Sequence, residues 1–222
     1  MVSRRHRVFI TGGTGYIGSR LIPELLKQGH DVTALVRAQS KSKLAAQCVT
    51  VFGNALEGAS YTSFVKGADT FIHLVGVSHP SPAKARQFIE IDQRSGIEAI
   101  RVAAQNDIEH FIYLSVAHPA PVMKTYITAR VACEQSLLES GLNSTIMRPW
   151  YVLGPGHRWP YILLPLYRIA EIFPRTRVSA LRLGLITAGE IVNALVASVA
   201  NPAAGIRVIE VPQIRELARS IQ

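Results

Sequence analysis

Short apolar runs alternate with longer stretches of helical periodicity along most of the chain. The apolar runs predict buried strands, and they occupy 8–11, 31–36, 48–52, 70–75, 110–114, 144–147 and 206–209. Apolar residues at helical spacing predict helices over 16–27, 84–105, 125–139 and 190–199. The last helix is preceded by Thr187, and Glu190 follows three residues later, a spacing that favours a reciprocal cap at the helix start.

This alternation predicts the fold class. Strands separated by helices pair in parallel through right-handed crossovers, which gives a Rossmann-type, doubly wound α/β sheet, here of about seven strands. No repeat, low-complexity segment or linker divides the sequence. We therefore expect one domain over 1–222, with a cofactor-binding core over 1–150 and a small C-terminal cap with closing helices over 151–222.

A glycine-rich turn joins the first predicted strand to the first predicted helix. It consists of Thr11, Gly12, Gly13, Thr14, Gly15, Tyr16, Ile17 and Gly18. These glycines satisfy two spacings, GxGxxG and GxxGxxG, in which a backbone without side chains approaches a pyrophosphate at a helix N-terminus. An ordinary tight turn is the alternative, but the position between a strand and a helix favours dinucleotide binding.

The end of the second predicted strand indicates which dinucleotide binds. A site for NAD would carry an acid there to bind the ribose hydroxyls, but Asp31 lies at the other end of this strand. Arg37 stands at the expected place, and basic residues follow it at Lys41 and Lys43. An arginine there stacks on adenine and pairs with a 2′-phosphate, so the sequence favours NADP over NAD. The alternative is a solvated basic loop.

Taken together, the motifs resemble a known superfamily. They run in order along the chain as the glycine turn, 71–76, 111–115, 126–130, Glu134, Arg148 with Pro149, and 154–156. In this order they resemble the extended and atypical short-chain dehydrogenase/reductase superfamily, especially its small NAD(P)H-binding, NmrA-like or epimerase-like members. The resemblance covers the chain to about residue 156, and 185–199 resembles the closing helix of that superfamily.

The resemblance implies roles for residues around a cofactor. Gly12, Gly15 and Gly18 would hold the pyrophosphate. The dinucleotide groove would be lined by His73, Val75 and Gly76. Asn54 stands where an aspartate commonly touches adenine, and the nicotinamide would lie against Pro149, Tyr151 and Val152.

The resemblance also implies a catalytic group. Ser115, Tyr126 and Arg130 stand where the superfamily has serine, tyrosine and lysine. A tyrosine and a cation four residues apart share one helix face, and a nearby positive charge favours the phenolate needed for acid–base work on a carbinol oxygen. Arg130 is a departure, because its planar fork is bulkier than an ammonium group and does not readily release a proton. The alternative is that Tyr126 and Arg130 form a structural helix pair.

Composition narrows the choice of partners. Lysine and arginine number 24 against 15 aspartate and glutamate, a net charge of +9 that suits an anionic cofactor. The two cysteines lie far apart, and no cluster of residues has metal-ligand spacing, so we expect no metal. No aromatic-rich basic stripe indicates nucleic acid, and no apolar run spans a membrane. We expect a soluble cytoplasmic protein of unknown oligomeric state.

The apolar segment 159–173 leaves three interpretations open: a lid over a hydrophobic substrate, a membrane-facing patch, or a packed cap helix. The sequence as a whole favours an NADP-preferring oxidoreductase, or an epimerase-like relative, that transfers hydride to or from a carbonyl or alcohol of a small apolar substrate. A non-catalytic NADPH-binding redox sensor or assembly subunit is the alternative, which Arg130 in place of lysine favours. A reductase in peripheral contact with a membrane is the third hypothesis.

Overall fold

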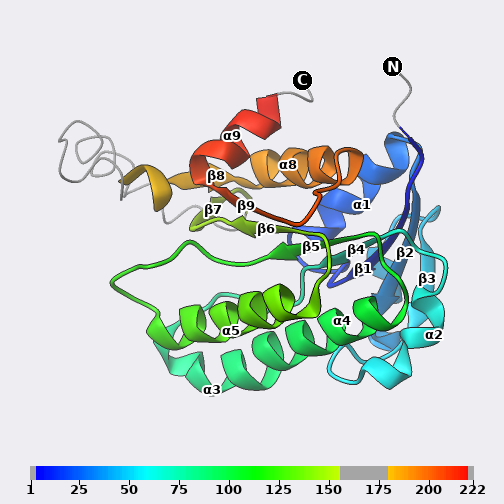
Figure 1. The fold of residues 1–222 in the computed structure, drawn as a ribbon, viewed down its shortest axis with the longest axis horizontal. Coiled ribbons are helices and arrows are strands. Elements are labelled where there is room, and N and C mark those ends of the chain that lie inside the picture. The colour runs from blue at the N-terminus through cyan, green and yellow to red at the C-terminus, as the bar shows by residue number, and fades with distance from the viewer. Residues whose placement is uncertain (1–3, 156–179, 220–222) are drawn as a thin grey trace.

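A parallel sheet runs through the centre of the protein between two layers of helices (Figure 1). The computed structural model describes residues 4–155 and 180–219. Within these residues the sheet has seven strands in the order β3-β2-β1-β4-β5-β6-β9. The strands are β1 (Arg7–Thr11), β2 (Asp31–Val36), β3 (Val49–Phe52), β4 (Thr70–His73), β5 (His110–Leu114), β6 (Ser144–Arg148) and β9 (Ile206–Glu210). Every pair of neighbouring strands in this sheet is parallel, which confirms the predicted doubly wound fold.

Helices cover both faces of the sheet. Figure 1 shows one layer made of α1 (Gly18–Lys27), α8 (Ala188–Ala200) and α9 (Val211–Arg219). The opposite layer contains α2 (Thr62–Val65), α3 (Ala85–Gln87), a π-helical stretch (Phe88–Gln93), α4 (Arg94–Gln105) and α5 (Lys124–Ser140). Short 3-10 turns lie at Ala38–Lys43, Gly58–Ser60 and Pro82–Lys84.

Successive side chains along a strand point to opposite faces of the sheet, so the apolar strands form two hydrophobic cores, one on each face. In β1, Ile10 points toward the α1 and α8 side, while Phe9 points toward α4 and α5. Phe9 lies in register with Phe71, which lies in register with Phe111. The ring centroids of each neighbouring pair are 5.2 Å apart, so three aromatic rings bridge β1, β4 and β5 on one face.

Most helix positions agree with the sequence, but their ends differ in two places. The predicted cap of the helix before residue 200 is confirmed, because Thr187 and Glu190 exchange side-chain and backbone hydrogen bonds at the start of α8. The predicted helix over 16–27 begins only at Gly18, because Tyr16 and Ile17 still belong to the glycine turn. The predicted helix over 84–105 is divided, with a π-helical stretch in its first half.

The C-terminal part contributes to the sheet as well as to its surroundings. Strand β9 pairs with β6 and completes the sheet, and α9 packs against α8. A separate two-stranded sheet joins β7 (Tyr151–Leu153) to β8 (Leu185–Thr187). Neither this sheet nor α9 was predicted from the sequence. The apolar segment 159–173 lies outside the described residues.

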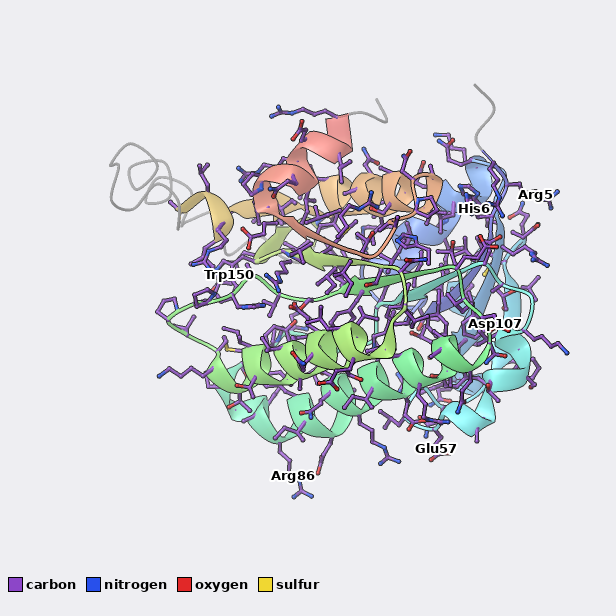
Figure 2. All side chains as sticks on the ribbon, viewed as in Figure 1. Arg5, His6, Glu57, Arg86, Asp107 and Trp150 are labelled. Atoms are coloured by element: carbon purple, nitrogen blue, oxygen red, sulfur yellow. The ribbon has the colours of Figure 1, made fainter. Side chains whose placement is uncertain are left out.

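Two histidines, His6 and His110, are buried at the amino ends of the strands. Figure 2 shows His6 at the end of the molecule opposite Trp150, which follows β6. His110 begins β5, and its Nε2 lies 2.9 Å from the hydroxyl of Thr145. Burial lowers the pKa of His110 from 6.5 to about 4, and the charges of Arg207 and His6 act in the same direction.

This burial predicts sensitivity to acid. Because the pKa of His110 is lower in the folded protein than in the unfolded chain, its share of stability is complete above pH 6.5 and is lost as the pH falls toward 4. We expect His110→Gln, which can keep a hydrogen bond to Thr145, to remove about 2 kcal/mol of this acid-dependent loss between neutral pH and about pH 4.5. Urea unfolding at neutral pH and at about pH 4.5 measures it. An unchanged difference between the two pH values would contradict the burial argument.

Candidate dinucleotide site

A cavity opens at the carboxyl ends of the strands on both sides of β1. Strand order reverses at β1, which lies between β2 and β4, and ligands of doubly wound sheets bind at such a switch point. The cavity has a volume of about 390 Å³, within the range of small-molecule sites. Its walls come from the glycine turn, the ends of β2 and β3, the loop after β4 and the first turns of the following helix. They are formed by Gly12, Thr14, Gly15, 35–37, 53–56, 74–78, Lys84, Gln87 and Ile91.

Glycine is required at two places in the turn between β1 and α1. Gly12 has a φ of +79°, and a Cβ there would lie 2.6 Å from the backbone carbon of Leu74. A Cβ at Gly18 would lie 2.5 Å from the carbonyl oxygen of Gly12. The turn therefore packs directly against the loop after β4 and against the start of α1. This leaves backbone, rather than side chains, at the cavity wall and at the helix N-terminus, where an anion is stabilised.

The loops after β2 and β3 form the opposite wall. Arg37 follows β2 and is exposed at the cavity, whereas Asp31 pairs with Arg5 at the other end of that strand. The backbone N–H of Asn54 donates to the Ser60 hydroxyl at 2.9 Å, and its own side-chain oxygen accepts from the backbone N–H of Leu56 at 3.1 Å. The Asn54 amide nitrogen is therefore the group that remains to hydrogen-bond a ligand.

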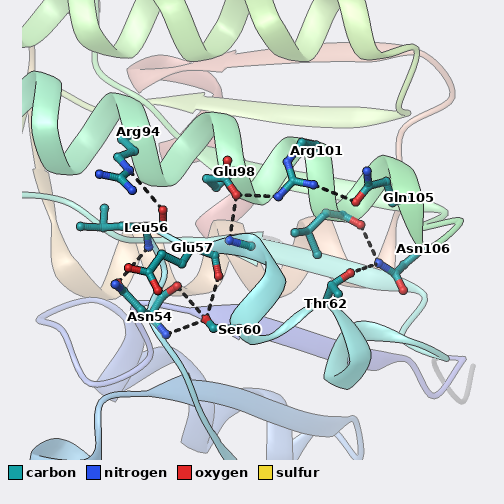
Figure 3. A network of polar contacts seen from close by, with 12 residues as sticks. Asn54, Leu56, Glu57, Ser60, Thr62, Arg94, Glu98, Arg101, Gln105 and Asn106 are labelled. Carbon is teal, nitrogen blue, oxygen red and sulfur yellow. Dashed lines mark hydrogen bonds and ion pairs between the residues drawn. The ribbon is translucent and has the colours of Figure 1, made fainter.

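The loop after β3 is held against α4 by a polar network (Figure 3). The Arg94 guanidinium donates to the carbonyl oxygen of Leu56 at 3.2 Å, and the backbone N–H of Gly58 donates to Glu98 at 2.8 Å. Glu98 also pairs with Arg101 at 2.7 Å, and this arginine lowers the pKa of the Glu98 carboxyl. The wall that carries Asn54 is thereby fixed before a ligand arrives.

His73 lies beneath the cavity rather than in its wall. Its side chain is fully buried at the end of β4, with Nδ1 2.8 Å from the Thr11 hydroxyl and Nε2 3.4 Å from that of Ser95. Burial, together with a smaller effect of the Arg130 charge, lowers its pKa to about 3, so the ring is neutral. His73 and Thr11 thus connect β1 to β4 and to α4.

Tyr126 and Arg130 lie on α5 beside the loop after β4. Tyr126 is half-buried, its ring centroid is 5.0 Å from that of Phe88, and the Arg130 guanidinium lies 5.2 Å from the Tyr126 centroid. Arg130 is buried, and its Nη2 pairs with Asp92 Oδ1 at 2.6 Å. Burial raises the pKa of the Asp92 carboxyl, and the Arg130 charge opposes that rise.

A second polar cluster surrounds the buried carboxylate of Glu134. The hydroxyl of Ser115 donates to Glu134, and Arg148 binds the same carboxylate through two nitrogens. His118 Nε2 lies 3.3 Å from Glu134 Oε2, the carboxylate oxygen that Ser115 does not contact. Ser115 is therefore hydrogen-bonded within the protein at the carboxyl end of β5.

Two further findings concern metal-binding groups and membrane-spanning helices. Among residues 4–155 and 180–219, no group of three or more histidine, cysteine, aspartate or glutamate side chains is arranged to hold a metal ion. No helix in that part of the chain has the length and apolar character that a membrane span needs.

The sequence profile of a family described as NAD(P)H-binding matches residues 12–163, which is more than half of the chain. The chain belongs to the NAD(P)H-binding family. The matched region contains the glycine turn, the loop after β4 and the part of α5 that carries Tyr126 and Arg130. The cavity described above fits such a ligand, because the glycine turn lines it through Gly12, Thr14 and Gly15 at the start of α1, where a pyrophosphate binds in this motif.

Individual relatives of this NAD(P)H-binding chain include reductases and an assembly factor. Ceramide reductase of Caulobacter vibrioides is 26% identical over 213 residues, which are 94% of this chain and 65% of that protein. A 3-beta-hydroxysteroid dehydrogenase of Mycolicibacterium neoaurum is 26% identical over 113 residues, 48% of this chain and 31% of that one. The photosystem II assembly factor Ycf39 of Synechocystis is 25% identical over 145 residues, with coverages of 64% and 44%. The chain spans less than two thirds of the length of each.

Solved structures of this fold confirm the architecture. The Bordetella bronchiseptica enzyme WbmH in complex with NAD+ has a TM-score of 0.70 and 21% identity, and the match covers 98% of this chain and 81% of that one. MoeE5 in complex with UDP-glucose and NAD has a TM-score of 0.68 and 19% identity, with coverages of 97% and 82%. These two likenesses show the fold. The family match and the dehydrogenase and reductase relatives confirm the resemblance to the short-chain dehydrogenase/reductase superfamily.

The structure brings only part of the predicted site together at the cavity. Gly12, Thr14, Gly15, Arg37, Asn54, Val75 and Gly76 line it. Three other residues of the glycine turn support it: Gly13 packs against Ile22, Ile17 precedes α1, and Tyr16 packs beside Gly154 with Arg20 over its ring. The remaining candidates lie outside the cavity wall and comprise Thr11, Gly18, His73, Ser115, Tyr126, Arg130, Pro149, Tyr151 and Val152.

Two residues at or behind the cavity wall, Lys84 and Asp92, were not identified from the sequence. Lys84 lines the cavity and donates to the carbonyl oxygen of Ser78 at 2.6 Å. Asp92 binds Arg130. The sequence does contain a sign that Asp92 is buried and paired. An acid four residues after Phe88, on the apolar face of a predicted helix, requires a buried partner.

Proposed function

We propose that this NAD(P)H-binding chain is an NADP-preferring oxidoreductase, or an epimerase-like relative, acting on a carbonyl or alcohol of a small apolar substrate. The observation that carries the proposal is the cavity at the switch point, walled by the glycine turn on one side and by Arg37 and Asn54 on the other. The reductase relatives support the same reaction class.

In this proposal each wall of the cavity binds a different part of the cofactor. Gly12 and Gly15, with the N-terminus of α1, hold the pyrophosphate through backbone N–H groups and the helix dipole. The Asn54 amide binds near adenine, and the Arg37 guanidinium pairs with the 2′-phosphate. The bound nicotinamide supplies or accepts a hydride, and the protein orients it and exchanges the proton.

Arg37 makes cofactor preference testable. A guanidinium at the end of β2 attracts a 2′-phosphate but gains little from a free ribose hydroxyl. We expect Arg37→Leu to weaken NADPH binding about tenfold, roughly 1.4 kcal/mol, and to leave NADH binding unchanged. Calorimetric titration measures both constants. Lys27→Leu, which removes an exposed cation outside the cavity wall, is the matched control and should change neither. An equal loss for both dinucleotides in Arg37→Leu would contradict the assignment.

Tyr126 is the proposed acid–base group, with Ser115 as its partner at the substrate oxygen. The half-buried phenol lies beside a guanidinium, whose central carbon is 5.2 Å from the ring centroid. We expect Tyr126→Phe to lower turnover about 100-fold or more and to leave NADPH affinity unchanged. The assay follows NADPH absorbance with a ketone chosen from a screen of hydrophobic ketones on the wild type. Full turnover in Tyr126→Phe would remove this mechanism.

A non-catalytic role as an NADPH-binding sensor or assembly subunit is the second candidate. It is favoured by Arg130, which stands in place of the superfamily lysine and is bound to a buried aspartate, and by the assembly factor among the relatives. The two roles are distinguished by purifying the protein with NADPH. Retained cofactor that no ketone or quinone oxidises supports the second candidate, and rapid oxidation by one of them supports the enzyme.

The remaining assignments form part of the same proposal. We place the chain in the cytoplasm, as one unit with most of its cofactor-binding core over 1–150. Within 151–222, β9, α8 and α9 belong to the central sheet and its helix layer rather than to a separate substrate-side cap. A small molecule, rather than nucleic acid, is its partner. Peripheral membrane contact through 159–173 is tested by co-sedimentation with anionic vesicles at low salt.

A further inference from the structure

The Arg130 guanidinium is held within the protein core through its two Nη atoms, while its buried Nε has no hydrogen-bond partner. Besides its 2.6 Å contact with Asp92, Nη1 donates to the carbonyl oxygen of Leu114 at 2.9 Å and Nη2 to that of Val75 at 3.5 Å. Arg130 is 5% exposed and Asp92 is not exposed at all. A side chain with these contacts joins α5 to the ends of β4 and β5.

Asp92 carries the connection onward to the cavity. Its second carboxylate oxygen accepts the backbone N–H of Val77 at 2.9 Å. Asp92 lies in the π-helical stretch, where the wider turn changes the direction of the side chains that follow, and such stretches are frequent at functional sites. In this stretch Asp92 is buried against Arg130 while Ile91 lines the cavity.

Gly76 allows the ion pair to lie directly behind the cavity wall. A Cβ at Gly76 would lie 2.3 Å from Arg130 Nη2 and 3.2 Å from Asp92 Oδ1. The guanidinium therefore packs against the bare backbone of 75–77, the segment whose other side faces the cavity. Each residue of 75–77 contacts the ion pair through its backbone: Val75 through its carbonyl oxygen, Gly76 through its backbone at the position of the missing Cβ, and Val77 through its N–H.

We propose that Arg130 and Asp92 are a positioning pair that fixes the backbone of 75–77 against the bound dinucleotide. This inference rests on the proposed function for its ligand. Arg130 acts through Asp92 and the loop, so the arginine at the lysine position holds the cofactor-binding wall in place rather than binding ribose hydroxyls. It also accounts for the buried aspartate in the π-helical stretch.

The test replaces both members with apolar residues of similar size. An Arg130→Met, Asp92→Leu double variant removes the charges together, and such replacements of buried ion pairs commonly preserve the fold. Hydrogen exchange of the Val77 amide reads the loop without cofactor, and calorimetric titration reads NADPH binding. We expect the double variant to unfold within a few degrees of the wild type, to exchange the Val77 amide at least ten times faster and to bind NADPH at least tenfold more weakly.

Two further variants complete the design. Asp69→Asn disturbs another buried pair, formed with His6 at the opposite edge of the sheet. It should lower the melting temperature without changing Val77 exchange or NADPH affinity. Arg130→Lys keeps a charge beside Asp92 but lacks the fork that reaches the Leu114 and Val75 carbonyls, so it should show an intermediate increase in exchange. It also provides the test if the double variant does not fold.

The outcomes separate this inference from the proposed function. Wild-type exchange and wild-type NADPH affinity in the double variant, or in Arg130→Lys if only that variant folds, would overturn the positioning role. If the wild type binds no dinucleotide while Val77 exchange still rises in the variants, the proposed function fails but the pair is shown to hold the loop. If exchange is unchanged and only binding falls, Arg130 contacts the ligand directly and the inference is wrong.

Discussion

Gly12→Ala is expected to abolish useful dinucleotide binding. Its backbone is left-handed, with φ at +79°, and a methyl group would meet the Leu74 backbone at 2.6 Å, so the turn and the loop after β4 must separate. We expect NADPH affinity to fall about 100-fold or more, roughly 2.8 kcal/mol of binding free energy. The left-handed backbone alone costs about 1–2 kcal/mol of folding stability. Calorimetric titration and urea unfolding measure the two effects.

Gly29→Ala is the matched control for this variant. Gly29 also has a positive φ, at +84°, but nothing lies within 4 Å of a Cβ built there, and it is not part of the cavity wall. It should lose about 1–2 kcal/mol of stability through backbone strain and bind NADPH as the wild type does. Equal losses of affinity in both variants would show that global destabilisation, not the turn, controls binding.

Arg130→Met alone is expected to be the most destabilising single substitution in this account. It leaves the Asp92 carboxylate without its cation at a position that is 0% exposed. Breaking a buried ion pair by removing one partner costs about 3–5 kcal/mol, and urea unfolding at neutral pH measures it. Protonation of Asp92 relieves the unpaired charge, so the destabilisation should decrease as the pH is lowered.

Arg86→Met provides the surface comparison. Arg86 pairs with Glu90 on an exposed helix face, and Figure 2 shows its side chain pointing away from the fold. Exposed pairs of this kind contribute little, so its unfolding midpoint should match that of the wild type. A similarly small effect of Arg130→Met would mean that Asp92 is readily neutralised and that its pair with Arg130 contributes little to stability.

The sheet was predictable because its signals are local. Apolar runs such as 8–11 and 110–114 end at turn residues, and the cap formed by Thr187 and Glu190 follows from their spacing. The short pairing of β7 with β8 was not predictable in this way, because each strand has three residues and β8 begins only at Leu185, far along the chain from β7. Helix α9 was missed although Val211, Ile214 and Ala218 are buried at helical spacing.

The same distinction between local signals and long-range contacts applies to the candidate site. The glycine turn and Arg37 were found because their residue types are tied to a local backbone position. The partner of Arg130 was not found, because Asp92 meets it across two helices that are far apart in sequence. Ser115 shows the same limit: its bond to Glu134 depends on how α5 packs beside β5, which no spacing within either element specifies.

Calorimetric titration of the cofactor-stripped protein with NADPH, and separately with NADH, decides whether the cavity at the switch point binds a dinucleotide and whether it prefers NADP. We expect saturable binding of both, with NADPH at least about tenfold tighter, a difference of roughly 1.4 kcal/mol. Binding of neither would contradict the dinucleotide site, and tighter binding of NADH would contradict the role of Arg37.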